Sequence, residues 1–379
     1  MNALLISRML LAASALAGTL AWAENGVTAD KVVIGQSAAL TGPAKLLGTE
    51  MRDGANAYFS QVNAAGGVNG RTIELISLDD GYEPEKAAGN TRKLIEQDKV
   101  FALFGYVGTP TSLASQPVFT EAKVPFFAPF TGADALRSPF NRYIFNIRAG
   151  YSDETEKIVR HSLGLNLKRI AVFYQNDSYG KAGLSGVEQA LERRGMQLAA
   201  TATVERNSTN VKDAVAKLSA VKPEAVIMVS AYKSCAAFIK EMLAHGASAQ
   251  FYNVSFVGSR PLAEELGDEG AGVVISQVMP FPFEQVQPVV REYRAAMQKF
   301  QPKAQVSFTS LEGFIAAKVF VEGLRKAGLN PTRESLMAAL EKIDSYDVGG
   351  FKVSFSSHNH SQSKFVDLTV IQKGGGFRN

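Results

Sequence analysis

Cysteine is almost absent from this chain of 379 residues, which contains only Cys235. A single cysteine excludes an intramolecular disulfide, and a chain of this length buries enough surface to fold without one. Cys235 lies in "SAYKSCAAFIK" near an expected helix start, and we interpret it as a small packed residue. Histidine is scarce as well, and none of the four has a spacing typical of a metal site or a nucleophile–base pair.

Runs of like charge and nucleotide-binding motifs are also missing. The net charge of +4 is scattered along the chain, so no nucleic-acid surface is indicated. The first expected strand is not followed by G-x-G-x-x-G, and no phosphate-loop motif occurs. A secreted hydrolase would need a nucleophile elbow, and "GLSGV" at 183–187 has the wrong spacing. We therefore predict a protein that is not an enzyme and that has no cofactor or metal.

The first 23 residues have the pattern of a secretory signal peptide. Arg8 precedes the apolar run Met9–Leu20, and Ala21-Trp22-Ala23 fits the small-x-small cleavage site before Glu24. The alternative, a membrane anchor, would need a longer run and a charged stop-transfer flank. No cysteine lies near the cleavage site, so lipid attachment is not indicated. The sequence predicts a secreted protein.

The rest of the chain alternates short apolar strands with amphipathic helices in two blocks that meet near residue 149. The first block has strands at 32–35, 73–78, 101–106 and 124–130 and helices at 50–65, 83–98 and 109–122. The second block has strands at 169–175, 199–204, 225–230, 250–257 and 272–281. Its helices are at 152–163, 181–194, 211–219 and 236–244. Three later helices follow at 288–300, 310–327 and 333–343. This alternation predicts two Rossmann-like α/β lobes with parallel central sheets.

Ligands of open parallel sheets bind at the carboxyl ends of the strands, which draws attention to the corner "FGYVGTPTSLASQP". Pro110 suits the first position of a helix, so we expect Thr109 to be the N-cap residue whose hydroxyl accepts a first-turn N–H. Gly108 permits a tight turn. The helix N-terminus would attract an anion such as a carboxylate. The alternative is a capped helix that binds nothing.

Three further corners follow strands and carry polar or aromatic side chains. Thr131 and Gly132 lie in "APFTGADALR", Tyr179 lies in "QNDSYGKAG", and Arg260 lies in "VGSRPLAEEL". If the two blocks face each other, these corners define a cleft between them. Asp79 and Asp80 also follow a strand, but we interpret that pair as a solvated turn.

The segment "VVIGQSAALTGPAKLLGTEMRDGANAYFSQVNAAGGVNGRTIELISLDDGYEPEKAAGNTRKLI" resembles the opening of bacterial periplasmic leucine/isoleucine/valine-type binding proteins, and "RIAVFYQNDSYGKAGLSGVEQAL" resembles the start of their second lobe. The resemblance covers nearly the whole mature chain. It implies a type I periplasmic binding fold with a three-segment hinge, with crossings near 148–151, 277–281 and 354–360. The implied lobes are residues 24–148 plus 281–354 and residues 149–280 plus 355–379.

The resemblance also assigns site residues. Thr109 matches a hydroxyl that binds the ligand carboxylate, and Phe130 matches a residue whose backbone carbonyl receives the ligand ammonium. Tyr179 matches the second-lobe aromatic residue that closes over the ligand, and Leu47 matches a bulky residue at the pocket mouth.

Three positions depart from the family pattern. Gly132 stands where a second carboxylate-binding hydroxyl is expected, although Thr131 is adjacent. Ala231 stands where a tyrosine is familiar, with Tyr232 beside it. Arg260 stands where an acidic residue pairs with the ammonium of an amino acid, and a cation there would instead attract an anion.

These departures favour an aromatic or other organic acid, or a dicarboxylate, over a plain branched-chain amino acid. Tyr82, Tyr106, Phe130 and Tyr179 would supply its apolar walls. The alternative is that Arg260 faces solvent or forms a structural ion pair. The implied function is a monomeric solute-binding protein that serves the permease and ATPase of an ABC importer. A periplasmic sensor subunit that signals to a membrane receptor is the other hypothesis.

Overall fold

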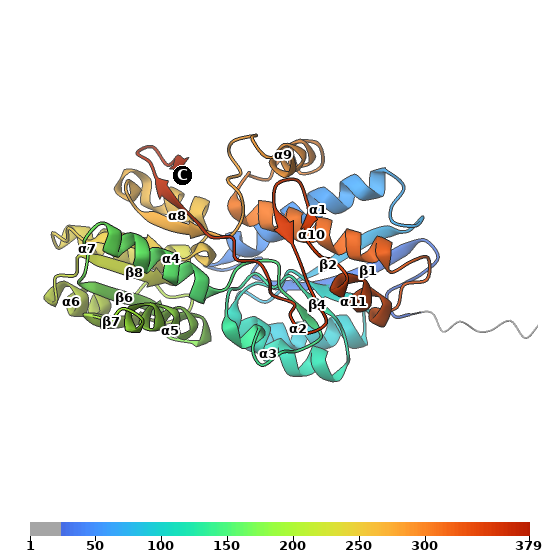
Figure 1. Cartoon of the computed structure of the whole chain (residues 1–379), viewed down its shortest axis with the longest axis horizontal. Coiled ribbons are helices and arrows are strands. Elements are labelled where there is room, and N and C mark those ends of the chain that lie inside the picture. The colour runs from blue at the N-terminus through green and yellow to red at the C-terminus, as the bar shows by residue number, and fades with distance from the viewer. Residues whose placement is uncertain (1–23) are drawn as a thin grey trace, which may run out of the picture.

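The computed structural model describes residues 24–379, and the predicted signal peptide lies outside the described residues. The described chain forms two α/β lobes that lie side by side, each built on a mainly parallel sheet (Figure 1). This architecture confirms the fold class predicted from the alternation of strands and helices. No helix within residues 24–379 is long and apolar enough to cross a membrane.

The first lobe contains a five-stranded sheet with the order β2-β1-β3-β4-β5, and every neighbouring pair is parallel. Its strands are β1 (Lys31–Ala38), β2 (Thr72–Asp79), β3 (Ala102–Phe104), β4 (Phe126–Phe127) and β5 (Ile144–Phe145). Its helices are α1 (Lys45–Ala64), α2 (Pro84–Glu96) and α3 (Thr109–Glu121) and, late in the chain, α9 (Pro288–Phe300), α10 (Phe308–Lys326) and α11 (Arg333–Glu341). The late helices belong here because α10 packs along α1 and α11 packs on α10.

The second lobe contains a seven-stranded sheet with the order β14-β13-β10-β9-β8-β6-β7. Its strands are β6 (Ile170–Gln175), β7 (Ala200–Val204), β8 (Ala225–Val229), β9 (Gln250–Asn253), β10 (Val274–Gln277), β13 (Asp367–Ile371) and β14 (Phe377–Arg378). Its helices are α4 (Tyr151–Gly164), α5 (Ser178–Glu192), α6 (Lys212–Ala220), α7 (Tyr232–Ala244) and α8 (Ser259–Leu266). All five residues of β8 are apolar and buried, as a central parallel strand covered on both faces requires.

The chain passes between the lobes three times. Residues 146–150 connect β5 to α4, residues 278–287 connect β10 to α9, and residues 354–366 connect β12 (Lys352–Val353) to β13. β12 pairs with β11 (Tyr346–Asp347) in a small separate hairpin. The last crossing is the red segment that runs from the first lobe back to the second in Figure 1, where β13 pairs antiparallel with β10.

Several predicted strands are shorter than their apolar runs indicate: the runs 101–106, 124–130 and 272–281 are strands only at 102–104, 126–127 and 274–277. A fourth, 250–257, is shortened by a contact with Glu154. The run 250–257 is β9 only as far as Asn253, and Ser255–Val257 forms a short 3-10 helix. Glu154 causes the change, because its carboxylate accepts hydrogen bonds from the backbone N–H of Ser255 at 2.8 Å and from its hydroxyl at 3.0 Å. The turn moves Phe256 out of the sheet and toward the first lobe, where its ring contacts that of Phe130.

Candidate functional site

The loops that follow the strands of both sheets meet between the lobes, and we call this region the inter-lobe cleft. Near its middle, Gln175 at the end of β6 donates a hydrogen bond to the hydroxyl of Tyr82 after β2, over 3.2 Å. At one margin, Arg206 of the second lobe donates to Glu83 of the first over 2.9 Å. Side chains of both lobes therefore meet in this region.

Thr109 belongs to a chain of hydroxyl groups in this cleft. Its Oγ1 lies 2.6 Å from Oγ1 of Thr131, which in turn lies 3.3 Å from the hydroxyl of Tyr151. The predicted N-cap role is wrong: α3 begins at Thr109 itself, and Gly108 is the N-cap residue. The Thr109 hydroxyl is used between loops instead. In the first turn of α3, the backbone N–H groups of Thr109 and Thr111 have no partner within residues 24–379, whereas the N–H of Ser112 donates to the Gly108 carbonyl, so an anion could still be attracted there.

Gly132 lets Tyr151 approach this hydroxyl chain. The Gly132 carbonyl accepts the backbone N–H of Tyr151 over 2.7 Å. Burial raises the pKa of the Tyr151 hydroxyl to about 12, so that group stays protonated at neutral pH and can donate a hydrogen bond. The departure from the family's hydroxyl at position 132 therefore has a steric explanation, and Thr131 is the hydroxyl that faces Thr109.

Replacing Gly132 with alanine is expected to displace Tyr151, because the added Cβ would lie 2.6 Å from Tyr151 Cδ1 and 2.8 Å from its backbone N. Overpacking of this kind costs about 1–3 kcal/mol, so thermal denaturation followed by circular dichroism should show a lower Tm. Gly89→Ala is the control, since the space around Gly89 on α2 is open and alanine stabilises a helix by up to about 1 kcal/mol. Equal Tm values for the two variants would contradict the steric role of Gly132.

Aromatic rings from both lobes surround Phe256. Its ring centroid lies 4.6 Å from that of Tyr179, 5.3 Å from that of Phe130 and 5.8 Å from that of Tyr82. The Tyr179 ring also lies 5.4 Å from Tyr151. All five rings are buried, and we call them the aromatic cluster. The structure thus brings together Tyr82, Phe130 and Tyr179, three of the four residues predicted to form apolar walls.

The fourth predicted wall residue, Tyr106, lies elsewhere. Its hydroxyl is 3.0 Å from Oγ1 of Thr91 on α2, and its ring packs against Phe126 in a separate cluster of the first lobe. Gly105 explains the difference, because its φ of +61° breaks the alternation of side chains after β3. Tyr106 is therefore part of a helix-packed core rather than of the aromatic cluster.

The Phe130 backbone already has one partner. Its carbonyl accepts the N–H of Gly108 over 3.2 Å, so the role predicted for it with a ligand ammonium would have to use the second lone pair of the oxygen. The Phe130 ring lies under the guanidinium of Arg148, with 4.8 Å between the Arg148 Cζ and the ring centroid. A buried cation thus lies against the ring of the residue whose backbone carbonyl was expected to receive an ammonium.

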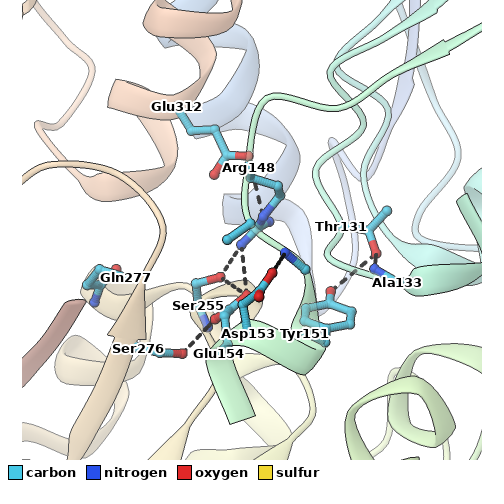
Figure 2. A network of polar contacts seen from close by, with 12 residues as sticks. Thr131, Ala133, Arg148, Tyr151, Asp153, Glu154, Ser255, Ser276, Gln277 and Glu312 are labelled. Carbon is cyan, nitrogen blue, oxygen red and sulfur yellow. Dashed lines mark hydrogen bonds and ion pairs between the residues drawn. The ribbon is translucent and has the colours of Figure 1, made fainter. Parts of the chain in front are cut away.

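Arg148 is a fully buried cation in the first crossing segment. Figure 2 shows it between Glu312 of α10 on one side and Ser255 with Glu154 of α4 on the other. Its Nη2 donates to the Ser255 hydroxyl and lies 3.7 Å from Glu154, and its Nε lies 3.7 Å from Glu312. The network links both lobes at the hinge.

Burial dominates the electrostatics of this network. It raises the pKa of Glu312 to about 7 and the pKa of Glu154 above its ordinary value, in both cases against the attraction of Arg148. Burial also disfavours the charged guanidinium, but the two carboxylates outweigh it and raise the pKa of Arg148. The guanidinium of Arg148 therefore stabilises the charged forms of both Glu154 and Glu312.

Arg260 lies at the opposite margin of the cleft, next to Leu47 and Tyr232. Its guanidinium donates to Glu50 of α1 over 2.5 Å and to Glu264 one turn along α8. Leu47 is buried against the backbone of Gly258, and the Tyr232 hydroxyl lies beside the Leu46 backbone. The structural ion pair, which was the alternative for Arg260, is the arrangement observed.

The acidic pair after β2 has two different environments. Asp79 accepts hydrogen bonds from Leu40, Thr41 and Gly81, as a turn residue does. Asp80 is fully buried, so the prediction of a solvated turn is wrong for this residue. Burial raises the pKa of Asp80 to about 6, although Ser37 donates to it over 2.7 Å.

Several buried polar atoms around the cleft have no hydrogen-bond partner in residues 24–379. Among them are Ser112 Oγ on α3 and, in the second lobe, Gln175 Oε1, the Tyr179 hydroxyl and Ser230 Oγ, and the hinge adds Nε and Nη1 of Arg148. Buried polar groups almost always have partners, so a bound molecule is the natural acceptor and donor for this set. The described residues contain no group of three or more His, Cys, Asp or Glu side chains that could hold a metal ion.

Several residues of the site were not predicted from the sequence, among them Gln175, Ser112 and Ser230, and three more were seen but given no role in the site. Arg148 was placed only in a crossing segment, Phe256 was assigned to a strand, and Tyr151 was given no role. One signal was available, because Arg148 is the only charged residue between Asn146 and Tyr151. A charge at a hinge between two lobes indicates a partner from each.

Comparison with known proteins places these features in a wider group. A family model described as "Periplasmic binding protein" matches residues 31–376. The solved structure of a possible leucine/isoleucine/valine-binding protein of Rhodopirellula baltica SH 1 is similar, with 36% identity, a TM-score of 0.88, and coverage of 92% of this chain and 96% of that one. A substrate-binding periplasmic protein of Ralstonia solanacearum is similar at 34% identity and a TM-score of 0.86, over 91% and 99% of the two chains.

A curated relative gives a third comparison. The leucine-, isoleucine-, valine-, threonine- and alanine-binding protein of Pseudomonas aeruginosa is 24% identical over 323 residues, which cover 84% of each chain. The match thus extends over both lobes in each comparison.

Proposed function

Since this chain belongs to the periplasmic binding protein family, we propose that it captures an amino acid or related small organic acid in the inter-lobe cleft and delivers it to the permease and ATPase of an ABC importer. Its relatives are named for binding, and the chain is a binding protein and not an enzyme. The family implies a periplasmic location, which agrees with the signal peptide predicted at residues 1–23.

The unpartnered polar atoms of the cleft are the observation that supports this function most directly. Ser112 lies on the first lobe, and Gln175, Tyr179 and Ser230 lie on the second. Leaving a buried hydroxyl or amide oxygen without a partner costs about 1–3 kcal/mol each. A ligand that supplies these hydrogen bonds would contact both lobes at once.

Capture would then operate as a shift between open and closed forms. A ligand stabilises closure only by its better affinity for the closed form, and contacts to both lobes provide that difference. The three crossings at 146–150, 278–287 and 354–366 would bend as a hinge. Lobe boundaries at 24–148 plus 281–354 and at 149–280 plus 355–379 are part of this proposal.

Native mass spectrometry of the protein purified from periplasm tests the capture directly. We expect a small molecule to be released on denaturation, and we expect its return to the refolded protein to make the protein more compact in small-angle X-ray scattering. A chain that releases nothing and never becomes more compact with any amino acid or organic acid would contradict the proposal.

Tyr179→Phe is expected to lower the affinity for the released molecule by about tenfold, since losing one hydrogen bond costs about 0.5–1.5 kcal/mol and slightly more near charge. The matched control is Tyr106→Phe, which removes an equally buried hydroxyl that is bonded to Thr91. We expect that control to leave the affinity unchanged, as measured by isothermal titration calorimetry. A loss for Tyr106→Phe equal to that for Tyr179→Phe would return Tyr106 to the binding site.

A further inference from the structure

The acids around the cleft are already bound to other groups of the protein. Glu50 accepts from Arg260 over 2.5 Å and from Ser307 over 2.6 Å. Glu83 accepts from Arg206 over 2.9 Å and from Asn207 over 2.8 Å. Neither carboxylate is free to meet a positively charged group of a ligand.

The same holds in the interior of the second lobe. Glu154 accepts three hydrogen bonds from Ser255 and Ser276 and lies 3.7 Å from Arg148. Asp177 accepts the N–H of Tyr179 over 2.9 Å and a hydrogen bond from Arg206 over 3.2 Å. These carboxylates stabilise the loops of the cleft and are not available to a ligand.

Two buried acids of the first lobe complete the set. Asp80 accepts from Ser37 over 2.7 Å and from the N–H of Tyr82 over 2.8 Å. Glu312 has one oxygen without a hydrogen bond in the described chain, but that oxygen lies 3.7 Å from Arg148 Nε. A ligand ammonium would compete there with a guanidinium. Burying an ammonium without its own carboxylate is costly.

An anionic group has suitable partners on the first lobe. The N-terminus of α3 is buried at Thr109. Pro110 has no N–H, and those of Gly108 and Ser112 are bonded to backbone carbonyls, so within the described residues the backbone N–H groups of Thr109 and Thr111 are left for an anion. The Thr109 and Thr131 hydroxyls lie beside this helix end. Ser112 Oγ is three residues further on, and therefore on the same helix face, and it is buried and unpartnered. This unpartnered hydroxyl is a second, independent sign of a ligand at the helix end.

Aromatic rings pack next to this helix end, where the ring of Tyr82 lies against Gly108. The ring of Phe256 contacts three rings from both lobes, with centroid distances of 4.6 Å to Tyr179, 5.3 Å to Phe130 and 5.8 Å to Tyr82. Such rings favour a flat apolar group stacked among them. Beyond the rings, Gln175 Oε1 and Ser230 Oγ remain unpartnered at the ends of β6 and β8.

We propose that the ligand is an aromatic carboxylate that carries no amino group, with its carboxylate at the N-terminus of α3 and its ring in the aromatic cluster. This inference rests on the proposed capture of a small molecule in the same cleft. Arg260 is not expected to hold a second carboxylate of the ligand, because its guanidinium is engaged by Glu50 and Glu264.

Matched pairs of probes separate the two parts of the proposal. Isothermal titration calorimetry on residues 24–379, unfolded and refolded to remove any bound molecule, would compare 3-phenylpropionate with phenylalanine and 4-methylpentanoate with leucine. Each pair differs only in the amino group, and the two acids differ in the ring. We expect 3-phenylpropionate to bind at least tenfold more tightly than phenylalanine and at least tenfold more tightly than 4-methylpentanoate.

Each of the other possible binding results contradicts a specific part of the proposal. Binding of leucine or phenylalanine as tight as that of its deaminated partner overturns the exclusion of an ammonium, and Glu312→Gln would then show whether Glu312 is its partner. Tighter binding of 4-methylpentanoate than of 3-phenylpropionate overturns the aromatic class. If none of the four probes binds, the ligand class is wrong. The proposed capture function fails as well only if native mass spectrometry of the unrefolded protein also finds no bound molecule.

A variant locates the carboxylate. Thr109→Val keeps the size of the side chain and removes its hydroxyl, and it is expected to weaken binding of 3-phenylpropionate by about tenfold. Thr120→Val is the control, because Thr120 lies at the far end of α3 and bonds only to Asn141. Unchanged binding in Thr109→Val would show that the carboxylate is held elsewhere.

Discussion

Replacing Arg148 with alanine is expected to lower the free energy of unfolding by about 3–5 kcal/mol at pH 8, because removing one partner of a buried ion pair leaves the other charge uncompensated. The side chains of Arg148 and Glu154 are fully buried, and that of Glu312 is 3% exposed. The variant would leave two carboxylates in the hinge without their shared guanidinium.

The loss in free energy of unfolding caused by Arg148→Ala is expected to become smaller as the pH falls. Burial already raises the pKa of Glu312 to about 7, from an ordinary value of 4.5, and raises the pKa of Glu154. Without Arg148 both would rise further. A carboxyl group whose pKa is higher in the folded than in the unfolded state destabilises the fold at any pH above its folded-state pKa. This destabilisation disappears as the pH falls to the pKa of the unfolded state. Urea denaturation at pH 8, 6.5 and 5 should therefore show the largest difference from wild type at pH 8.

Two further variants separate the buried network from a general effect of losing an arginine. Arg142→Ala breaks an exposed pair with Glu334, and a surface pair of this kind contributes at most about 1 kcal/mol. Adding Glu312→Gln to Arg148→Ala removes one uncompensated carboxylate and should restore part of the loss at pH 8. A loss in Arg148→Ala that is independent of pH and unaffected by Glu312→Gln would show that packing, rather than charge, is responsible.

The architecture follows from the sequence because its signals are local. β8 is a continuous apolar run, and the helices carry apolar stripes, so alternating strands and helices suffice to predict parallel sheets. The corners at Thr109, Thr131 and Tyr179 could also be found, because ligands of parallel sheets bind where strands end. In the structure these three residues are linked through Tyr151.

The remaining features of the cleft depend on contacts between distant parts of the chain. Phe256 leaves its strand because Glu154, about a hundred residues earlier, binds the backbone of Ser255. Arg260 is withdrawn from the ligand because Glu50 of the other lobe reaches it. No local pattern contains such pairings. Alignment with the family predicts where in the fold a residue lies, whereas the side chains that it contacts in this chain determine its role.

The location of Phe256 gives it a different energetic role from that of other buried aromatic residues. Its contacts with Tyr82 and Phe130 cross between the lobes, so under the proposed hinge motion they would form as the lobes close. Phe173, in contrast, stacks on Phe238 within the second lobe at 4.1 Å. Contacts within a lobe stabilise folding, while contacts between lobes contribute to closure and therefore to affinity.

Phe256→Ala is accordingly expected to weaken binding of the captured molecule by about 30-fold or more, which corresponds to a loss of about 2 kcal/mol or more at a binding hot spot. Phe173→Ala should instead lower the free energy of unfolding by about 3–5 kcal/mol and leave the affinity of the folded protein nearly unchanged. Titration calorimetry and urea denaturation of both variants measure the two quantities separately. The contradicting result is that Phe256→Ala loses as much folding stability as Phe173→Ala and keeps its affinity for the captured molecule. That result would show that Phe256 is an ordinary core residue of the second lobe and that the aromatic cluster does not hold the ligand.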